Sequence, residues 1–266
     1  MKIIVCVKQV PDTSGKVAVN PDGTLDRASM QTITNPDDLN AVEAALKLKD
    51  ETGCEVIVVT MGPPPAEGML REILARGADK AVLVSGREFG GSDTYATSQI
   101  LAAAINRIGV EKDDIVMCGR QAIDGDTAQV GPQIAEKLGL PQISYAAEIK
   151  KEGDVITVQR MLEDGYMTIK VKTPCLVTCI KELNEPRYMS VGGIFDAYAK
   201  PMEVFDYNAL KDDPLIDAIT IGLKGSPTNI LTSFTPPQKG AGVMLEGDGK
   251  ETCDQLAAIL AKKHII

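Results

Sequence analysis

The sequence predicts an α/β protein with a doubly wound, mostly parallel sheet, an antiparallel extension and an extended C-terminal arm. Two observations lead to this prediction. Short β-branched runs alternate with helical patterns through the first half of the chain. Polar residues do not interrupt these runs, as expected of parallel strands that helices cover on both faces. Right-handed crossovers between such strands then give a doubly wound fold.

The first helix is the most clearly marked element of the parallel part. Asn35 is a strong N-cap, and Pro36 suits the first helical position. Asp37 and Asp38 then oppose the positive end of the helix, and Gly53 ends it. The same alternation predicts strands at residues 2–8, 55–61, 81–85 and 114–118, a turn at 20–23, and further helices at 65–76, from Asp93 to Gly109, and at 126–138.

The pattern changes at about residue 144. Residues 145–151, 154–161, 166–172 and 175–181 predict strands that pair antiparallel, with Glu163 and Asp164 in a turn. Beyond residue 186 the periodicity is weak, apart from a helix at 252–263. We therefore expect an α/β nucleotide- or flavin-binding domain at 1–186, a loop at 187–200 and an arm at 201–266. Such an arm packs on another chain, which we favour, or wraps its own domain.

Composition excludes several classes of function. The 266 residues carry 28 basic and 37 acidic side chains, a net charge of −9, so no general positive field attracts nucleic acid or an anionic membrane. No apolar run reaches the ~18 residues of a membrane span, and the first residues predict a buried strand rather than a signal peptide. Six scattered cysteines without a C-x-x-C pair favour a reducing cytoplasm. The only histidine is His264, so we expect no histidine-based catalytic group and no metal site.

The segment after the fourth parallel strand carries the strongest sign of a binding site. In an open parallel sheet, ligands bind beyond the carboxyl ends of the strands. Residues 119–131, GRQAIDGDTAQVG, lie there and lead into the fourth helix. Gly119 and Gly125 permit close approach of a ligand, and unpaired N–H groups at residues 127–130 suit a phosphate or a diphosphate.

Other interpretations of this region stay open. The two aspartates in the motif would repel a phosphate, so they cap the helix or bind a ribose hydroxyl instead. A well-capped turn without a ligand explains the motif equally well, because N-capped turns are common. The patterns G-x-G-x-x-G and G-x-x-x-x-G-K-[ST] are absent, so the residues indicate a Rossmann-like nucleotide-binding domain and no more. Residues 61–65 form the wall of an adenine pocket or a rigid loop, and Met30, Met61 and Met117 are expected in packing.

Six stretches together resemble the beta subunit of the electron-transfer flavoproteins over nearly the whole chain. They are 5–12 (VCVKQVPD), 34–46 (TNPDDLNAVEAAL), 61–84, 119–131, 160–178 and 183–190 (LNEPRYMS). One departure is Met167, where the family usually has Glu or Gln. The resemblance implies an adenine-nucleotide-binding domain that pairs with a larger alpha subunit, and that alpha subunit carries FAD.

The resemblance also implies a cofactor site, since typical members hold AMP between the strand ends and the loop after the fourth strand. Carried over by position, the cofactor-binding residues are Cys6, Asn35, Pro36, Asp37, Asp38, Met61, Gly119, Arg120, Gln121, Ala122, Ile123, Asp124, Gly125, Asp126, Thr127, Ala128, Gln129 and Val130. Typical AMP-binding members have bulkier, polar residues at positions 128 and 130. The small Ala128 and Val130 resemble instead an anaerobic group that binds a second FAD there and bifurcates electrons.

Residues 187–200 match the recognition loop with which the family docks a partner dehydrogenase. Val191 would be its apolar anchor, beside Ile194, while Gly192 and Gly193 let the loop adapt. A bifurcating member would take electrons from NADH and pass them to ferredoxin or flavodoxin and to a flavin dehydrogenase of the acyl-CoA or lactate type. The flavin would do the chemistry, so no catalytic side chain is expected. Two other functions stay open: a carrier that holds AMP and does not oxidise NADH, and an adenine-nucleotide-binding domain without redox activity.

Overall fold

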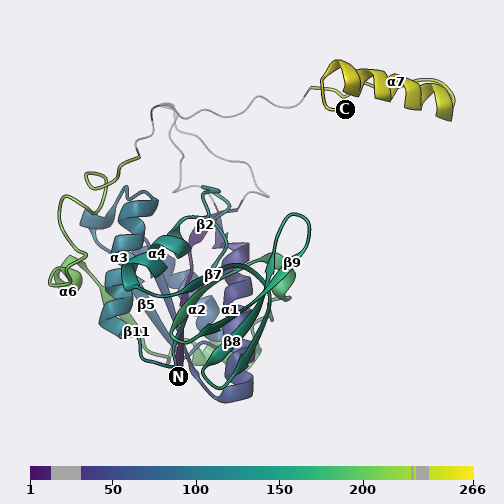
Figure 1. Cartoon of the computed structure of the whole chain (residues 1–266). Coiled ribbons are helices and arrows are strands. Elements are labelled where there is room, and N and C mark those ends of the chain that lie inside the picture. The colour runs from purple at the N-terminus through teal and green to yellow at the C-terminus, as the bar shows by residue number, and fades with distance from the viewer. Residues whose placement is uncertain (13–30, 229–230, 232–239) are drawn as a thin grey trace.

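The structure is a computed structural model that describes residues 1–12, 31–228, 231 and 240–266 (Figure 1). Within these residues, nine strands form one sheet in the order β11-β5-β4-β1-β6-β10-β7-β8-β9. The parallel strands are β1 (Lys2–Cys6), β4 (Glu55–Met61), β5 (Lys80–Val84), β6 (Ile115–Gly119), β10 (Cys175–Cys179) and β11 (Met202–Phe205). From β1 the chain adds strands first on the side of β4 and then on the side of β6, which confirms the doubly wound α/β fold.

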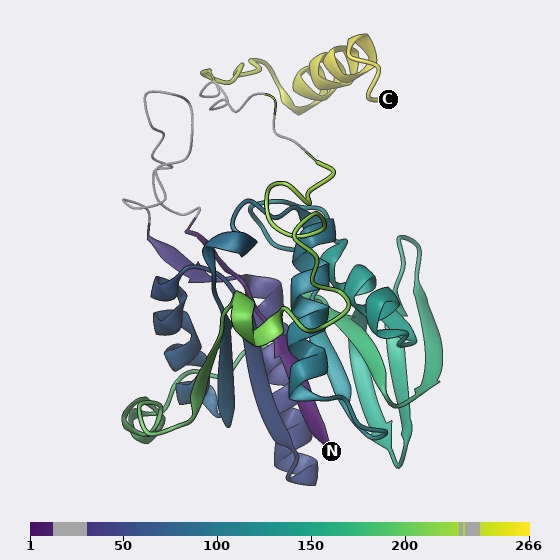
Figure 2. The ribbon, with the colours of Figure 1, turned by 90° about the vertical axis from the view of Figure 1, so that its left-hand side faces the viewer.

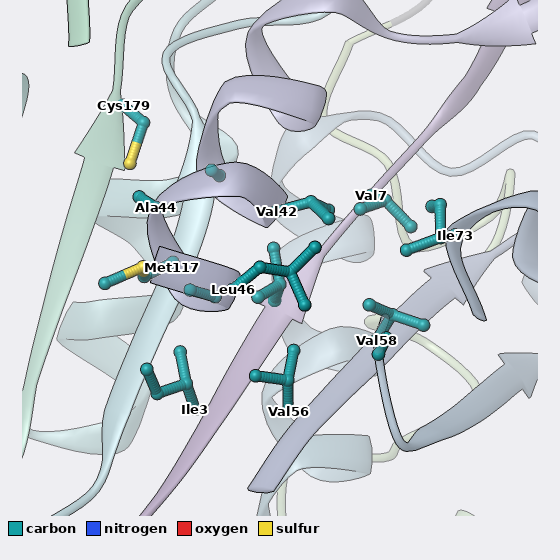
Figure 3. Close-up of a cluster of buried hydrophobic side chains, with 14 of the residues drawn as sticks. Ile3, Val7, Val42, Ala44, Leu46, Val56, Val58, Ile73, Met117 and Cys179 are labelled. Carbon is teal, nitrogen blue, oxygen red and sulfur yellow. The ribbon is translucent and has the colours of Figure 1, made fainter. Parts of the chain in front are cut away.

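Helices cover both faces of this sheet. They are α1 (Pro36–Thr52), α2 (Glu67–Arg76), α3 (Thr94–Ile108) and α4 (Val130–Leu138). Alternate residues of β1 enter two separate cores, so that Ile3 packs with Leu46 of α1 whereas Ile4 packs with Ile100 of α3. Figure 3 shows the first core, in which Met117 is fully buried as expected for a packing residue. The apolar runs in the strands therefore face helices on both sides.

Local sequence signals set most helix ends. Asp93 caps α3 by accepting a hydrogen bond from the N–H of Ala96 at 3.0 Å. Gly53 and Gly139 end α1 and α4 in the left-handed conformation, with φ of 69° and 63°. Shorter helical turns are η1 (Pro64–Ala66), η2 (Arg87–Phe89), η3 (Lys181–Leu183), α5 (Val191–Asp196) and α6 (Tyr207–Leu210).

An antiparallel extension continues the sheet beyond β10. It consists of β7 (Gln142–Glu152), β8 (Val155–Met161) and β9 (Tyr166–Lys172), and Figure 2 shows it extending away from the N-terminal strand. The expected turn is confirmed, because the N–H of Leu162 donates to the carbonyl of Gly165 at 2.8 Å. The prediction that residues 175–181 also pair antiparallel is wrong. All five residues of β10 are buried and the strand runs parallel to both β6 and β7, so it belongs to the covered part of the sheet.

The chain after residue 200 divides into two parts. β11 pairs parallel with β5, and Leu210, Ile216 and Ile221 are buried in the core beside α3. Residues 202–226 therefore wrap this chain's own domain, the alternative that the sequence left open. The last helix, α7 (Gly249–Lys262), begins with a capping box at Asp248 and buries none of its residues.

A small sheet pairs β2 (Gln9–Pro11) with β3 (Thr32–Thr34) at the end of β1. The turn expected at residues 20–23 and the packing role expected of Met30 lie outside the described residues. Among the helices that the structure describes, none has the length and apolar character needed to cross a membrane.

Candidate functional site

The candidate site lies where the ends of β1 and β6 meet the start of α1. The carboxylate of Asp38 joins these three elements, since it accepts the N–H of Lys8 at 2.8 Å and the N–H of Gly119 at 3.0 Å. Only glycine fits at position 119, because a Cβ there would lie 2.3 Å from Oδ1 of Asp38. In a doubly wound sheet, this place beside the first strand is where ligands bind.

Asp38 is buried at the base of this site, with 7 % of its surface exposed. Burial raises the pKa of its carboxyl group to about 7, although the hydrogen bonds from Lys8, Asn35 and Gly119 act in the opposite direction. Cys6, the last residue of β1, is also buried, and burial raises the pKa of its thiol to about 12. This thiol is therefore protonated at neutral pH and packs as a small apolar side chain.

Asn35 occupies the expected N-cap position of α1, but its side chain has a different role. No side-chain hydrogen bond caps α1; instead the amide of Asn35 donates to the carbonyl of Gln121 at 2.8 Å and accepts the N–H of Ile123 at 3.1 Å. Pro36 does lie in the first turn of the helix, as predicted. The side chain does not make the expected capping bond because the loop after β6 offers Asn35 both a donor and an acceptor. The contact fastens that loop to the start of α1.

The charged side chains of the loop also find partners. Lys8 Nζ lies 2.7 Å from Asp124 Oδ1 and 2.9 Å from Oδ2, and the Gln121 amide donates to Asp126 at 2.8 Å. Neither aspartate caps α4, which corrects one of the two roles expected for them. The lysine compensates the charge of Asp124 and reduces its repulsion of an anion.

Arg120 places a second positive charge at the site. The side-chain Nε of Arg120 lies 3.2 Å from Oδ2 of Asp37. The main-chain N–H of Arg120 donates to the carbonyl of Cys179 at 2.8 Å. Burial raises the pKa of the Asp37 carboxyl group, and Arg120 opposes that shift. The ends of β6 and β10 are thus joined to the first turn of α1.

The fourth helix begins later than the sequence predicts. Its first residue is Val130 rather than Asp126, and the first bond of the helix joins the N–H of Gln133 to the carbonyl of Gln129 at 3.0 Å. Asp126 and Ala128 have φ of 50° and 53°, a left-handed conformation that an α-helix cannot contain. Thr127 and Gln129 therefore belong to the loop. The N–H donors at the start of the helix are those of Val130 and Gly131.

The structure brings the expected binding segments together at one edge of the sheet. Cys6 ends β1, residues 35–38 open α1, and residues 119–130 form the loop that follows β6. Met61 ends β4 at the same edge, where its partly buried side chain packs against the core beside α3. Whether it borders an adenine stays a prediction.

The predicted recognition segment contains a short helix, so the expectation of a loop is corrected in part. Ser190 caps α5 by accepting the N–H of Gly193 at 2.9 Å. Val191 is 74 % exposed and Ile194 44 %. Gly193 does not serve adaptability, because a Cβ on it would lie 2.2 Å from the carbonyl oxygen of Ala75 in α2. Glycine is needed here for close packing of α5 on α2.

Comparison with known proteins identifies the family. A family model described as the electron transfer flavoprotein domain matches residues 22–210, more than half of the chain. The chain belongs to the electron transfer flavoprotein family. It is 68 % identical over 267 residues to the acryloyl-CoA reductase electron transfer subunit gamma of Anaerotignum propionicum, and the match covers both chains completely.

Two further relatives match over their full length and over all of this chain. One is CarD, a subunit of the caffeyl-CoA reductase-Etf complex of Acetobacterium woodii, with 53 % identity over 269 residues. The other is the electron transfer flavoprotein subunit beta of Clostridium acetobutylicum, with 49 % identity over 267 residues. The resemblance to the beta subunit is thereby confirmed.

Two features of this electron transfer flavoprotein chain are not evident from its sequence. Lys8 lies in residues 6–10, a segment expected beyond the end of the first strand, but its ion pair with Asp124 is not predicted and Lys8 is not named among the binding residues. The polar residues Asn40 and Glu43 of α1 are buried, which apolar periodicity alone does not predict. Their partners lie 144 residues away along the chain, so no local pattern reveals them.

Proposed function

We propose that this chain is the beta subunit of a two-chain electron transfer flavoprotein, and that its own site binds a second FAD in addition to the FAD of the alpha subunit. The described residues fit such a group. Residues 124–127 are exposed, and a Cβ on Gly125 would meet only open space. The helix-start N–H groups at Val130 and Gly131 suit a diphosphate, because the helix dipole favours negative charge there.

One observation favours FAD over AMP. Ala128, in the left-handed conformation, places only a methyl group in the loop just before the start of α4, and Val130 follows. Small side chains at this point leave room for the diphosphate of a bound adenine nucleotide to continue toward a flavin. AMP in the same pocket is the alternative, and it would make the chain a carrier that does not oxidise NADH.

The bound flavin would supply the redox chemistry, since flavins accept a hydride and release electrons singly. The residues of this chain would bind and orient it. In this proposal NADH is the donor, and one electron goes to ferredoxin or flavodoxin. The other electron would reach a flavin dehydrogenase of the acyl-CoA or lactate type by way of the alpha subunit. The names of two relatives, which refer to acryloyl-CoA and caffeyl-CoA reductases, support an acyl-CoA partner.

Docking of that dehydrogenase is assigned to residues 191–194. The exposed side chain of Val191 is suited to enter an apolar pocket, and a contact confined to so short a segment would be transient. The cytoplasm is the proposed location, supported by the six cysteines, all of which are free.

Flavin analysis of the native two-chain complex tests the proposal. Two FAD per complex support it, whereas one FAD with one AMP refutes it. The variant Ala128→Gln should lower the FAD content from two to one, because a longer side chain enters the space in front of α4. The matched control Ala199→Gln, at an exposed alanine after α5, should keep both. Stopped-flow bleaching of the flavin by NADH then separates bifurcation from simple carriage.

A further inference from the structure

The segment that precedes α5 is fastened to the side of α1. The amide of Asn40 donates to the carbonyl of Asn184 at 2.7 Å, and the amide of Asn184 donates back to the carbonyl of Asn40 at 3.0 Å. This reciprocal pair is buried on the α1 side, where Asn40 is 4 % exposed. The chain therefore leaves η3 along a fixed line rather than as a free connector.

Arg187 makes the stronger attachment, three residues further on. Its Nε and Nη2 donate to the two carboxylate oxygens of Glu43 at 2.9 and 3.1 Å, and its main-chain N–H also donates to Glu43 at 3.0 Å. A further bond joins Nη2 to Asp50 at 2.8 Å. The Glu43 side chain is 5 % exposed, so the pair is desolvated on one side and geometrically well defined.

The far end of the segment is attached to α2 instead. Arg71 donates to the carbonyls of Ala197 and Lys200 at 2.9 and 3.3 Å. The ammonium of Lys200 in turn donates to the carbonyls of Leu74 and Ala78 at 2.9 and 2.7 Å. The helix α5 is therefore held between two fixed points, one on each of two helices.

These two attachments determine which side of α5 faces outward. Gly193 and the buried Ala197 face α2. Val191 and Phe195 lie one helical turn apart in α5 and are 74 % and 76 % exposed, and Tyr198, just after the helix, is 75 % exposed. The apolar face of α5 thus points to solvent, the reverse of the usual arrangement in a surface helix.

We propose that Arg187 is a positioning residue for dehydrogenase docking: its fork on Glu43 and Asp50 sets the direction in which α5 presents Val191. The inference rests on the docking role proposed above for residues 191–194. Arg187 acts through α5 and need not contact the partner itself. Without the fork, the segment before α5 keeps the asparagine pair and the bond that the carbonyl of Arg187 accepts from Arg76 of α2. The first turn of α5 is then held less firmly, so fewer encounters are productive.

The test uses the two-chain complex and, as the electron acceptor, the acryloyl-CoA reductase of Anaerotignum propionicum purified without its own electron-transfer subunits. The variants are Arg187→Met, Arg187→Lys and the double variant Glu43→Leu with Arg187→Met. The double variant removes both charges, so no unpaired carboxylate is left buried to unfold the chain. The matched control is Arg107→Met, because Arg107 also ties down a C-terminal carbonyl, that of Ala209 at 2.9 Å.

We expect the KM for the reductase to rise by about tenfold in Arg187→Met and in the double variant, with kcat and flavin content within about twofold of the native complex. Arg187→Lys should recover part of the loss, because an ammonium keeps the charge but not the fork. Hydrogen exchange of the α5 amides should accelerate in the same variants. The control Arg107→Met should leave both the KM for the reductase and the hydrogen exchange of α5 unchanged.

A double variant that folds, keeps its flavin and shows an unchanged KM overturns the inference. A separate variant, Val191→Ser, distinguishes this from failure of the docking proposal. If Val191→Ser raises KM and the Arg187 variants do not, only the positioning role is wrong. If Val191→Ser also leaves KM unchanged, residues 191–194 do not dock the dehydrogenase and both proposals fall.

Discussion

Replacing Asp38 by asparagine should change how the stability of the chain depends on pH. In the folded chain the pKa of Asp38 is raised to about 7 by burial, whereas an aspartate in an unfolded chain titrates near pH 4. The folded state therefore holds a proton that the unfolded state has lost between about pH 4 and pH 7. Stability contributed by that proton is complete below this range and declines as the pH rises through it. A difference of about 3 pKa units corresponds to about 4 kcal/mol.

Urea unfolding of the full-length chain, followed by circular dichroism at several pH values, measures this effect. We expect the free energy of unfolding of the wild type, relative to Asp38→Asn, to fall by about 4 kcal/mol from about pH 4 to about pH 8. The control is Asp114→Asn, at the opposite end of β1. Asp114 also accepts a main-chain N–H, that of Lys2 at 2.7 Å, but the Lys2 ammonium lies 3.2 Å from it as a counter-charge. A constant difference between wild type and Asp38→Asn across the range would refute the argument.

Three further substitutions test the packing and charge of the same region. Gly119→Ala forces a Cβ to 2.3 Å from Asp38, so we expect a loss of about 2–5 kcal/mol in urea unfolding together with loss of bound nucleotide. Lys8→Met leaves the carboxylate of Asp124 without its partner near the start of α4. Because this ion pair is partly exposed, we expect little change in melting temperature. We expect weaker FAD binding in equilibrium dialysis, with a smaller loss at high salt. Leu46→Ala empties part of the core under α1 and should lower the free energy of unfolding by about 2–5 kcal/mol, while a loss below 1 kcal/mol would show that the site is not tightly packed.

Elements whose signals are local could be predicted closely from the sequence. Pro36 and Gly53 mark the two ends of α1, and the structure places that helix at Pro36–Thr52. The strand at residues 55–61 has the predicted bounds because a continuous β-branched run stands between Gly53 and a proline-rich turn. In such cases the residues that determine the element lie within it or next to it.

Features that depend on distant partners could not be predicted. The direction of β10 follows from its place between β6 and β7, and a short apolar run does not contain that information. The late start of α4 follows from left-handed conformations at Asp126 and Ala128, which residue type does not require. The carboxylate bridge of Asp38 likewise depends on the N–H groups of Lys8, after β1, and of Gly119, at the end of β6. The segments that the family resemblance assigns to the cofactor lie together because strand ends converge in this topology, whereas the contacts among these segments could not be predicted.

α1 carries the candidate cofactor site at one end and the anchor of the docking segment further along, since Asp38 and Asp50 lie about 18 Å apart at 1.5 Å per residue. The helix α1 therefore fixes the position of the docking segment relative to the candidate cofactor site. Protein engineers who wish to exchange partner preference between relatives should transplant residues 184–200 together with the helix that holds them. A graft of the segment alone would lack the α1 residues that hold it in its native orientation.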